Sequence, residues 1–254
     1  TLMRSSAASD VYKRQVITGG SRGIGRSMVL SFAQKGYNVV FCYEKNENAA
    51  FETEKEARKL GAEVYAFKAD VSKSEEVEKL FAFAEEKFSG ADVLICNAGI
   101  GRQRLFTDIT DEDFDQMIGV NLKGVFYCCR RALPYMIRNK WGRIINITSM
   151  WGETGGSCEV DYSAAKAGVI GLTKALAKEV GPSGITVNAV SPGVIETDMN
   201  RAFTPEDMAA LADETPLCRI GKPEEVAAAA VFLAGEEAGF ITGQVLGVNG
   251  GIVI

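Results

Sequence analysis

The chain has 254 residues, 46% of them hydrophobic, so it can bury a full core as one large α/β domain or two small ones. Its net charge of −5 gives no basic footprint for nucleic acid, and no apolar run approaches the roughly 20 residues that span a bilayer. The absence of histidine excludes Ser-His-Asp triads, Cys-His dyads and histidine-ligated metals. A general acid in this chain must therefore be Tyr, Lys, Cys or a carboxylate.

The first fifteen residues differ from the rest of the chain. The stretch "SSAASDVYKRQ" (residues 5–15) lacks the apolar core of a secretory signal and reads like a translated sequencing-library adapter. We therefore expect residues 1–15 to be a non-native leader and residues 16–254 to form one folded domain. Residues 11–17 can still form a strand, because Val11, Val16 and Ile17 suit the place of a first strand.

From Val16 onward, apolar runs of strand length alternate with helical patterns. Strands are predicted to end at Ile17 and to lie within 37–43, 62–70, 91–99, 142–149, 184–193 and 243–251. Helices are predicted from the glycine loop to Gly36, over 48–60, over 74–88 with Ser74 as N-cap, over 111–138, around Tyr162 and from Pro223, with 194–217 irregular. Apolar strands alternating with helices predict an α/β fold, a single doubly wound (Rossmann-type) domain with a seven-stranded parallel sheet.

The first strand runs into the glycine-rich stretch "TGGSRGIG", which opens the next helix. Glycines at such a turn let the backbone approach a pyrophosphate, whose charge is stabilised by the helix N-terminus. A glycine-rich turn alone is weak evidence, but its place after the first strand of a βαβ unit favours a dinucleotide site. The candidate cofactor residues here are Gly19, Ser21, Arg22, Gly23, Ile24 and Gly25.

The end of the second strand indicates which dinucleotide is bound. Sites for NAD usually place an acid there, whereas this chain has Tyr43. Arg22 in the glycine loop could pair with a 2′-phosphate, which favours NADP(H). Glu44, one residue further on, keeps NAD(H) possible.

Tyr162 and Lys166 lie four residues apart in a predicted helix, so their side chains leave the same face. A nearby ammonium favours the phenolate and should lower the pKa of the tyrosine. One Tyr-x-x-x-Lys match could also be a solvated pair on a helix surface, so the remaining motifs must decide.

Four motifs occur in order: Thr18-Gly-x-x-x-Gly-Ile-Gly25, Asn97-Ala-Gly99, Ser149 and Tyr162-x-x-x-Lys166. Together they resemble the short-chain dehydrogenase/reductase family, and the resemblance extends from Val16 to Ile254. It implies a dinucleotide-binding reductase domain in which NADPH delivers hydride to a carbonyl carbon.

The resemblance also implies a role for each catalytic residue. Tyr162 would give a proton to the carbonyl oxygen, and Lys166 would lower the Tyr162 pKa and hold the nicotinamide ribose. Ser149 would hydrogen-bond the substrate oxygen, and Asn121 would hold a water that relays protons. Asp70 would bind the adenine edge, although it could instead be a helix N-cap and Ser149 only a strand-end turn. The other implied cofactor residues are Val71, Asn97, Ala98, Gly99, Tyr162, Lys166, Pro192, Gly193 and Ile195.

Two subgroups of the family compete for the substrate. "SPGVIETDM" and "TPLCRIGKPEEVA" are similar to 3-oxoacyl-[acyl-carrier-protein] reductases of fatty acid biosynthesis, in which basic residues such as Arg143 and Lys178 would dock an acidic carrier. "LFTDITDEDF" and the segment from Ser149 resemble the elongation factor P 5-aminopentanone reductases. The acids Glu153, Glu159 and Asp161 would suit a cationic ketone better than a neutral thioester. The candidate substrate residues are Ser149, Trp151, Glu153 and Tyr162.

Acyl carrier protein and elongation factor P are thus the possible partners, with sugar or steroid dehydrogenases as further enzyme options. A non-catalytic dinucleotide-sensing protein is the alternative of another class, since the fold alone would allow it. The resemblance further implies a homotetramer. Six cysteines without a C-x-x-C pair, mostly in apolar runs, predict reduced thiols, a cytoplasmic location and no metal site.

Overall fold

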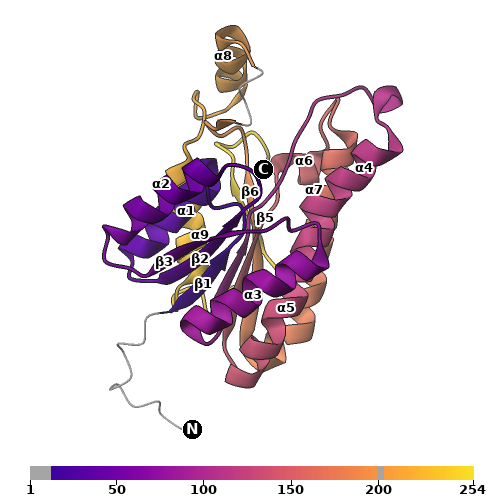
Figure 1. The fold of residues 1–254 in the computed structure, drawn as a ribbon. Coiled ribbons are helices and arrows are strands. Elements are labelled where there is room, and N and C mark those ends of the chain that lie inside the picture. The colour runs from indigo at the N-terminus through magenta and orange to yellow at the C-terminus, as the bar shows by residue number, and fades with distance from the viewer. Residues whose placement is uncertain (1–12, 199–202) are drawn as a thin grey trace.

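A parallel β-sheet forms the centre of the molecule (Figure 1). The computed structural model describes residues 13–198 and 203–254. Seven strands pair in the order β3-β2-β1-β4-β5-β6-β7, and every ladder is parallel, which confirms the predicted doubly wound fold. The strands are β1 (Arg14–Ile17), β2 (Asn38–Tyr43), β3 (Val64–Lys68), β4 (Val93–Cys96), β5 (Gly142–Ile147), β6 (Ile185–Pro192) and β7 (Val245–Val248).

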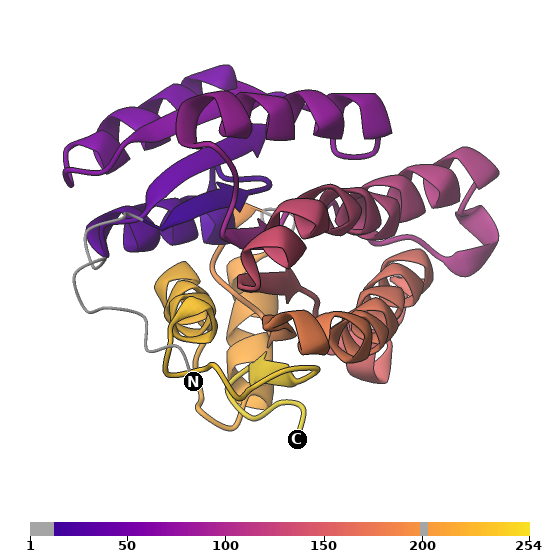
Figure 2. The same cartoon turned by 90° about the horizontal axis from the view of Figure 1, so that it is seen from below.

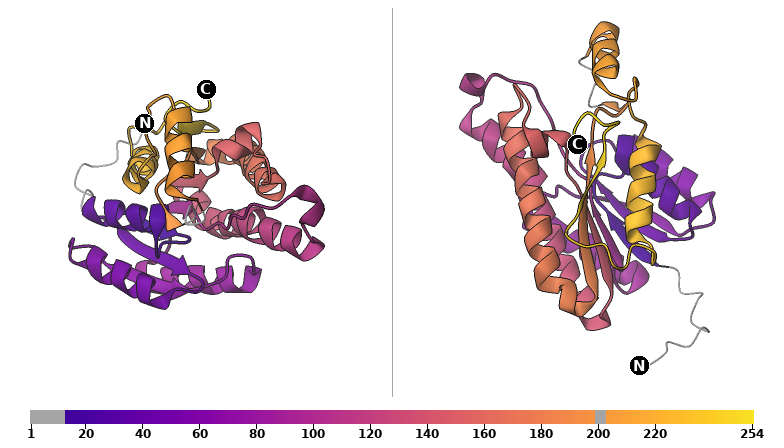
Figure 3. Two further views of the ribbon diagram at one scale, coloured as in Figure 1. Left: turned by 90° about the horizontal axis from the view of Figure 1, so that it is seen from above. Right: turned by 180° about the vertical axis from the view of Figure 1, so that it is seen from behind.

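Helices cover both faces of this sheet, as Figure 2 and Figure 3 show from below and from above. The helices are α1 (Gly23–Gln34), α2 (Glu47–Arg58), α3 (Ser74–Phe88), α4 (Asp111–Ile118), α5 (Gly124–Asn139), α6 (Met150–Thr154), α7 (Val160–Val180), α8 (Pro205–Glu214) and α9 (Pro223–Ala234). Helices α3, α5 and α7 enclose one core, and α1, α2 and α9 enclose the other. Successive residues of β5 alternate between the cores, Ile144 entering the first and Ile145 the second.

The helix predicted over 111–138 is interrupted. Helix α4 ends at Ile118, five residues (Gly119–Lys123) follow in π-helical geometry, and α5 then runs to Asn139. Asn121 lies in this wide turn, where its amide is turned toward Ile100 rather than along the helix surface. The interruption therefore contains Asn121, a candidate catalytic residue, and π-bulges are frequent at functional sites.

Two local predictions were wrong. Ser74 does not cap α3: the N-cap is Lys73, and Ser74 is already helical, with its hydroxyl accepting from Arg130 at 3.2 Å. The segment predicted to be irregular contains α8, which begins with a capping box between Thr204 and Asp207 and has Pro205 in its first turn. Helix α8 buries no side chain in the described chain, so the apolar stripe that would have revealed it is absent.

The first strand begins at Arg14 rather than at residue 11, and Val11 lies outside the described residues. The Arg14 guanidinium donates to both oxygens of Asp92, at 2.8 and 3.0 Å, and fixes the strand beside β4. The neighbouring Gln15 is fully buried, and its carboxamide has no hydrogen-bond partner among the described residues. A polar side chain thus lies at a buried position of the sheet without a polar partner among the described residues.

Candidate active site

The sequence-predicted site residues gather at the carboxyl edge of the sheet. The glycine loop follows β1, Asn97–Gly99 follow β4, Ser149 follows β5, and Pro192–Gly193 close β6. Because the strands are parallel, these four segments meet at one edge, where ligands of doubly wound sheets bind.

Ser149, Tyr162 and Lys166 form the centre of the site. Ser149 caps α6 by accepting the Trp151 N–H at 3.2 Å, and its side chain hydrogen-bonds Tyr162. The Lys166 ammonium donates to the Ile147 carbonyl at 2.8 Å and lies 5.6 Å from the centre of the Tyr162 ring. The prediction that Tyr162 and Lys166 share a face of α7 therefore agrees with the geometry, and Ser149 is more than a strand-end turn.

Burial sets the protonation of this pair. It raises the pKa of Tyr162 to about 12, although the hydrogen bond from Ser149 opposes the rise. It lowers the pKa of Lys166 to about 8, because the ammonium is cut off from water. The expectation that Lys166 draws the Tyr162 pKa below its ordinary value is therefore corrected: desolvation of the phenol decides the direction. Near neutral pH the tyrosine is fully protonated.

Asn121 is fully buried beside Lys166. Its Oδ1 accepts the Ile100 N–H at 3.2 Å, and its Nδ2 donates to the Ile100 carbonyl at 2.9 Å. A Cβ added to Gly99 would lie 2.7 Å from Asn121 Oδ1 and 3.6 Å from Lys166 Nζ. Gly99 thus lets Asn121 and Lys166 approach each other.

The glycine loop fits the pyrophosphate of a dinucleotide. Gly19 has a left-handed φ of 69°, and a Cβ there would come within 2.8 Å of the Ala98 backbone. Asn97 Nδ2 donates to the carbonyls of Thr18 and Gly19, both at 3.0 Å, and the Thr18 hydroxyl accepts the N–H groups of Asn97 and Ala98. Within the described residues, α1 begins without a side-chain cap or an acid in its first turn. Its first amides therefore have no side-chain acceptor there and could bind an anion.

Thr18 was not among the predicted site residues, although it opens the glycine motif. It joins that loop to the end of β4 through its hydroxyl. Three further residues were also missed, Glu196, Thr197 and Asp198, which with Arg22, Gly23 and Arg26 line a groove of about 470 Å³ beside the loop. Their place four to six residues after Pro192 was the available signal.

Arg22 extends toward this groove. Its Nη1 lies 3.6 Å from Asp198 Oδ2. Tyr43 ends β2 as predicted, and its hydroxyl donates to Glu47 at 3.5 Å. Both lie at the carboxyl end of the sheet. Arg22 lies near a carboxylate that a 2′-phosphate would have to displace.

Asp70, Val71 and Ile195 are held by the fold itself. Asp70 accepts the Ser72 N–H at 3.0 Å and the Ser72 hydroxyl at 2.7 Å. Burial alone would raise the pKa of Asp70, but these bonds and the nearby Lys73 lower it. Val71 packs against Gly124, and Ile195 is buried and bridges to Gly221. Asp70 thus closes the turn before α3, and its adenine role stays a prediction.

The acids near the site differ in their surroundings. Glu153 is exposed and accepts from the Ser191 hydroxyl at 2.5 Å, whereas burial raises the pKa of Glu159. Asp161 is only 2% exposed; its Oδ1 accepts the Tyr162 N–H at 2.9 Å, and its Oδ2 has no partner in the described chain. Trp151 lies half-buried on α6, against Gly156.

The residues expected to dock a carrier are not at the mouth of the site. Arg143 lies at the amino end of β5 and is only 4% exposed, so it offers little surface to a partner. Lys178 is exposed but lies sixteen residues after Tyr162 along α7, about 24 Å away. In this chain both face the opposite end of the sheet from Ser149.

The described residues contain no group of three or more His, Cys, Asp or Glu that could hold a metal ion. Over those same residues, no helix is long and apolar enough to cross a membrane.

Comparisons with known proteins find relatives along nearly the whole chain. A family model described as enoyl-(acyl carrier protein) reductase matches residues 19–253. The chain is 41% identical over 240 residues to the 3-oxoacyl-[acyl-carrier-protein] reductase FabG of Staphylococcus epidermidis, covering 94% of this chain and 98% of that protein. It is 42% identical over 240 residues to the protein of Bacillus subtilis named uncharacterized oxidoreductase YmfI, with the same coverage. FabG of Aquifex aeolicus is 40% identical, covering 94% of this chain and 97% of that protein.

Proposed function

The chain belongs to the short-chain dehydrogenase/reductase family of NAD(P)-dependent oxidoreductases, and on that premise we propose that it reduces the keto group of a 3-oxoacyl thioester carried by acyl carrier protein. The observation that carries the proposal is the contact between Ser149 and a buried, protonated Tyr162, with Lys166 beside them. The names and extent of the similar FabG proteins support the choice of substrate.

A dinucleotide bound at the glycine loop would supply hydride to the carbonyl carbon. Tyr162 donates its proton to the carbonyl oxygen, which a phenol with a pKa of about 12 can do only once that oxygen gains charge. Ser149 donates a hydrogen bond to the same oxygen and stabilises the charge as it forms. Lys166, close to the ring, stabilises the tyrosinate left behind, and Asn121 lies where it can order a water next to Lys166.

We propose NADP(H) as the preferred cofactor, with Arg22 as the ligand of the 2′-phosphate. Arg22 already lies near a carboxylate, and a phosphate carries more charge than Asp198. Glu44, exposed after β2, is the residue that would favour NAD(H) instead.

A second candidate is the reduction of a cationic ketone, the 5-aminopentanone group on elongation factor P. The observation that favours it is the buried carboxylate of Asp161, whose Oδ2 has no partner in the described chain, next to the half-buried Glu159. The burial of Arg143 also removes one expected contact with an acidic carrier. A substrate amine would gain from these acids, and a thioester would not.

One experiment separates the two. Purified chain is supplied with NADPH and either acetoacetyl-carrier protein or aminopentanone-modified elongation factor P, and kcat/KM is measured for each. A higher kcat/KM for the carrier thioester supports the first proposal, and the reverse supports the second. Failure to oxidise NADPH with either ketone, or with small ketones, would leave dinucleotide sensing as the function.

A further inference from the structure

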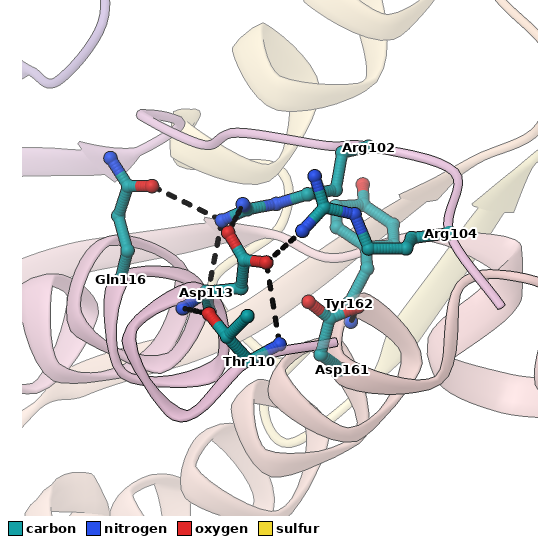
Figure 4. A network of polar contacts seen from close by, with 7 residues as sticks. All are labelled: Arg102, Arg104, Thr110, Asp113, Gln116, Asp161 and Tyr162. Carbon is teal, nitrogen blue, oxygen red and sulfur yellow. Dashed lines mark hydrogen bonds and ion pairs between the residues drawn. The ribbon is translucent and has the colours of Figure 1, made fainter. Parts of the chain in front are cut away.

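Two arginines of the loop after β4 share one carboxylate at the start of α4 (Figure 4). Arg102 and Arg104 pair with different oxygens of Asp113, and Arg102 also donates to the Asp113 carbonyl and to Gln116 Oε1, both at 3.1 Å. Thr110 and Asp113 form the capping box of α4. Burial alone would raise the pKa of the Asp113 carboxyl, but the hydrogen bonds from Thr110 and the charges of the two arginines lower it. We call Arg102, Arg104 and Asp113 the Asp113 clamp.

The same loop touches the residues before the catalytic helix. The Arg104 N–H donates to the Cys158 carbonyl at 2.8 Å, and the Gln103 side chain hydrogen-bonds Glu159. Cys158 has a left-handed φ of 60°, a conformation that is uncommon for a residue with a side chain. Glu159 is the N-cap of α7 and gives it no side-chain cap bond within the described residues. The loop therefore supports the residues at which α7 begins.

The loop also contacts Asn121 at its other end. The Ile100 N–H donates to Asn121 Oδ1 at 3.2 Å, and Asn121 Nδ2 donates to the Ile100 carbonyl at 2.9 Å. Tyr162 is the third residue of α7, and its N–H donates to Asp161 Oδ1. Residues 100–104 therefore connect Asn121 to the turn that carries Tyr162, and Figure 4 shows the clamp and Tyr162 together.

We propose that Asp113 is a positioning residue for the proton donor. By holding Arg102 and Arg104 it fixes the loop against the start of α7, and so keeps the Tyr162 hydroxyl beside Ser149. The proposal rests on the carbonyl reduction proposed above, with Tyr162 as the acid. Because the clamp acts on α7 rather than on the glycine loop, its loss should slow the chemical step and leave dinucleotide binding intact.

The test uses Asp113→Asn in the full chain, since the amide keeps the shape and loses the charge that both arginines need. We expect kcat for a ketone to fall about tenfold or more, because small misplacements of a reacting group are costly. The NADPH Kd should stay close to the wild-type value. The isotope effect on kcat with NADPH deuterated at the transferred hydride should rise. Arg104→Lys should act in the same direction, because an ammonium lacks the planar fork.

A matched control is Glu85→Gln. Glu85 also accepts two N–H groups from one arginine, Arg131, at 2.8 and 2.9 Å, but it joins α3 to α5 rather than the loop of residues 100–104 to α4. We expect its kcat and isotope effect to match wild type. Hydrogen exchange of the Tyr162 amide provides a readout without turnover: it should be faster in Asp113→Asn and unchanged in Glu85→Gln.

Two results would overturn the proposal. One is wild-type kcat together with wild-type exchange in Asp113→Asn. The other is a lower kcat with an unchanged isotope effect and unchanged exchange, which means fewer folded molecules rather than a misplaced acid. A wild-type chain that reduces no ketone would count against the proposed function, and the exchange measurement would still decide the role of Asp113.

Discussion

Tyr162 is protonated at neutral pH because burial raises its pKa to about 12. If it is the acid, Tyr162→Phe keeps the ring and removes the proton that would be transferred to the carbonyl oxygen. We expect turnover to fall by about 10²–10⁴-fold, the usual contribution of a general acid, while NADPH still binds. Steady-state kinetics and a fluorescence titration of NADPH measure the two effects. A variant that keeps more than about a tenth of the activity would remove Tyr162 from its role.

Lys166 gives a prediction about stability and pH. Its pKa is 10.5 in the unfolded chain and about 8 when buried, so the folded state carries an unfavourable charge below pH 8. The folded protein therefore becomes more stable as pH rises from about 8 to 10.5, because in this range the unfolded chain binds more protons than the folded chain does. Lys166→Met should therefore unfold at a higher urea concentration at pH 7. Its free energy of unfolding should rise by up to about 3 kcal/mol, reduced by the loss of the hydrogen bond to the Ile147 carbonyl.

The stability difference between Lys166→Met and wild type should shrink as the pH approaches 10. A constant difference across that range would show that packing, not charge, sets it. The same variant should have lost activity, because the ammonium is needed beside Tyr162. For the wild-type enzyme, kcat should decline as pH rises above about 8.

At the scale of single elements, β1 contains a buried polar side chain that lowers stability and can be replaced by mutation. Gln15 pairs with Val39 and Val93 in the sheet and buries a carboxamide that has no partner among the described residues. Gln15→Val should raise the free energy of unfolding by about 1–3 kcal/mol, because a buried unsatisfied polar group costs that much. Urea unfolding monitored by circular dichroism measures it, and Gln15→Glu should shift in the opposite direction. No gain in Gln15→Val would mean that the carboxamide is satisfied.

Elements that follow from local patterns could be predicted, and those that depend on distant contacts could not. The apolar runs of β2, β4, β5 and β6 identify buried parallel strands, and the glycine loop identifies the start of α1. Helix α8 was missed, although Thr204, Pro205 and Asp207 form a recognisable helix start. The π-helical turn has no such signal, because it is stabilised by Asn121 bonding to Ile100.

The same distinction applies to the site. The grouping of the candidate catalytic residues at one place could be predicted because their spacing matches a family motif, whereas the Asp113 clamp could not. In the sequence, Arg102, Arg104 and Asp113 look like three surface charges, and their pairing is a property of the fold. The direction in which the Tyr162 pKa shifts depends on burial, and the Tyr-x-x-x-Lys spacing does not reveal burial.

At the scale of the whole molecule, several apolar side chains lack cover. Phe126 and Ile137 on α5 are 46% and 44% exposed, and Phe114 on α4 is similarly open. On α7, Gly171 is exposed, and a Cβ there would meet nothing within 4 Å in the described chain. Helices with small residues and exposed aromatics can pack closely against a second copy of themselves. We therefore expect a homotetramer with two-fold symmetry.

Gly171→Leu tests that arrangement, because the added side chain has room in one subunit but would separate two closely packed α7 helices. Light scattering at micromolar concentration should show a tetramer for wild type and a smaller species for the variant, with circular dichroism unchanged. Gly181→Leu also adds a side chain to open space, beyond the end of α7, and should remain tetrameric. A stable, active wild-type monomer would contradict the prediction. A tetrameric Gly171→Leu would place the contact on another face, such as the edge of β7, where Leu246 is exposed.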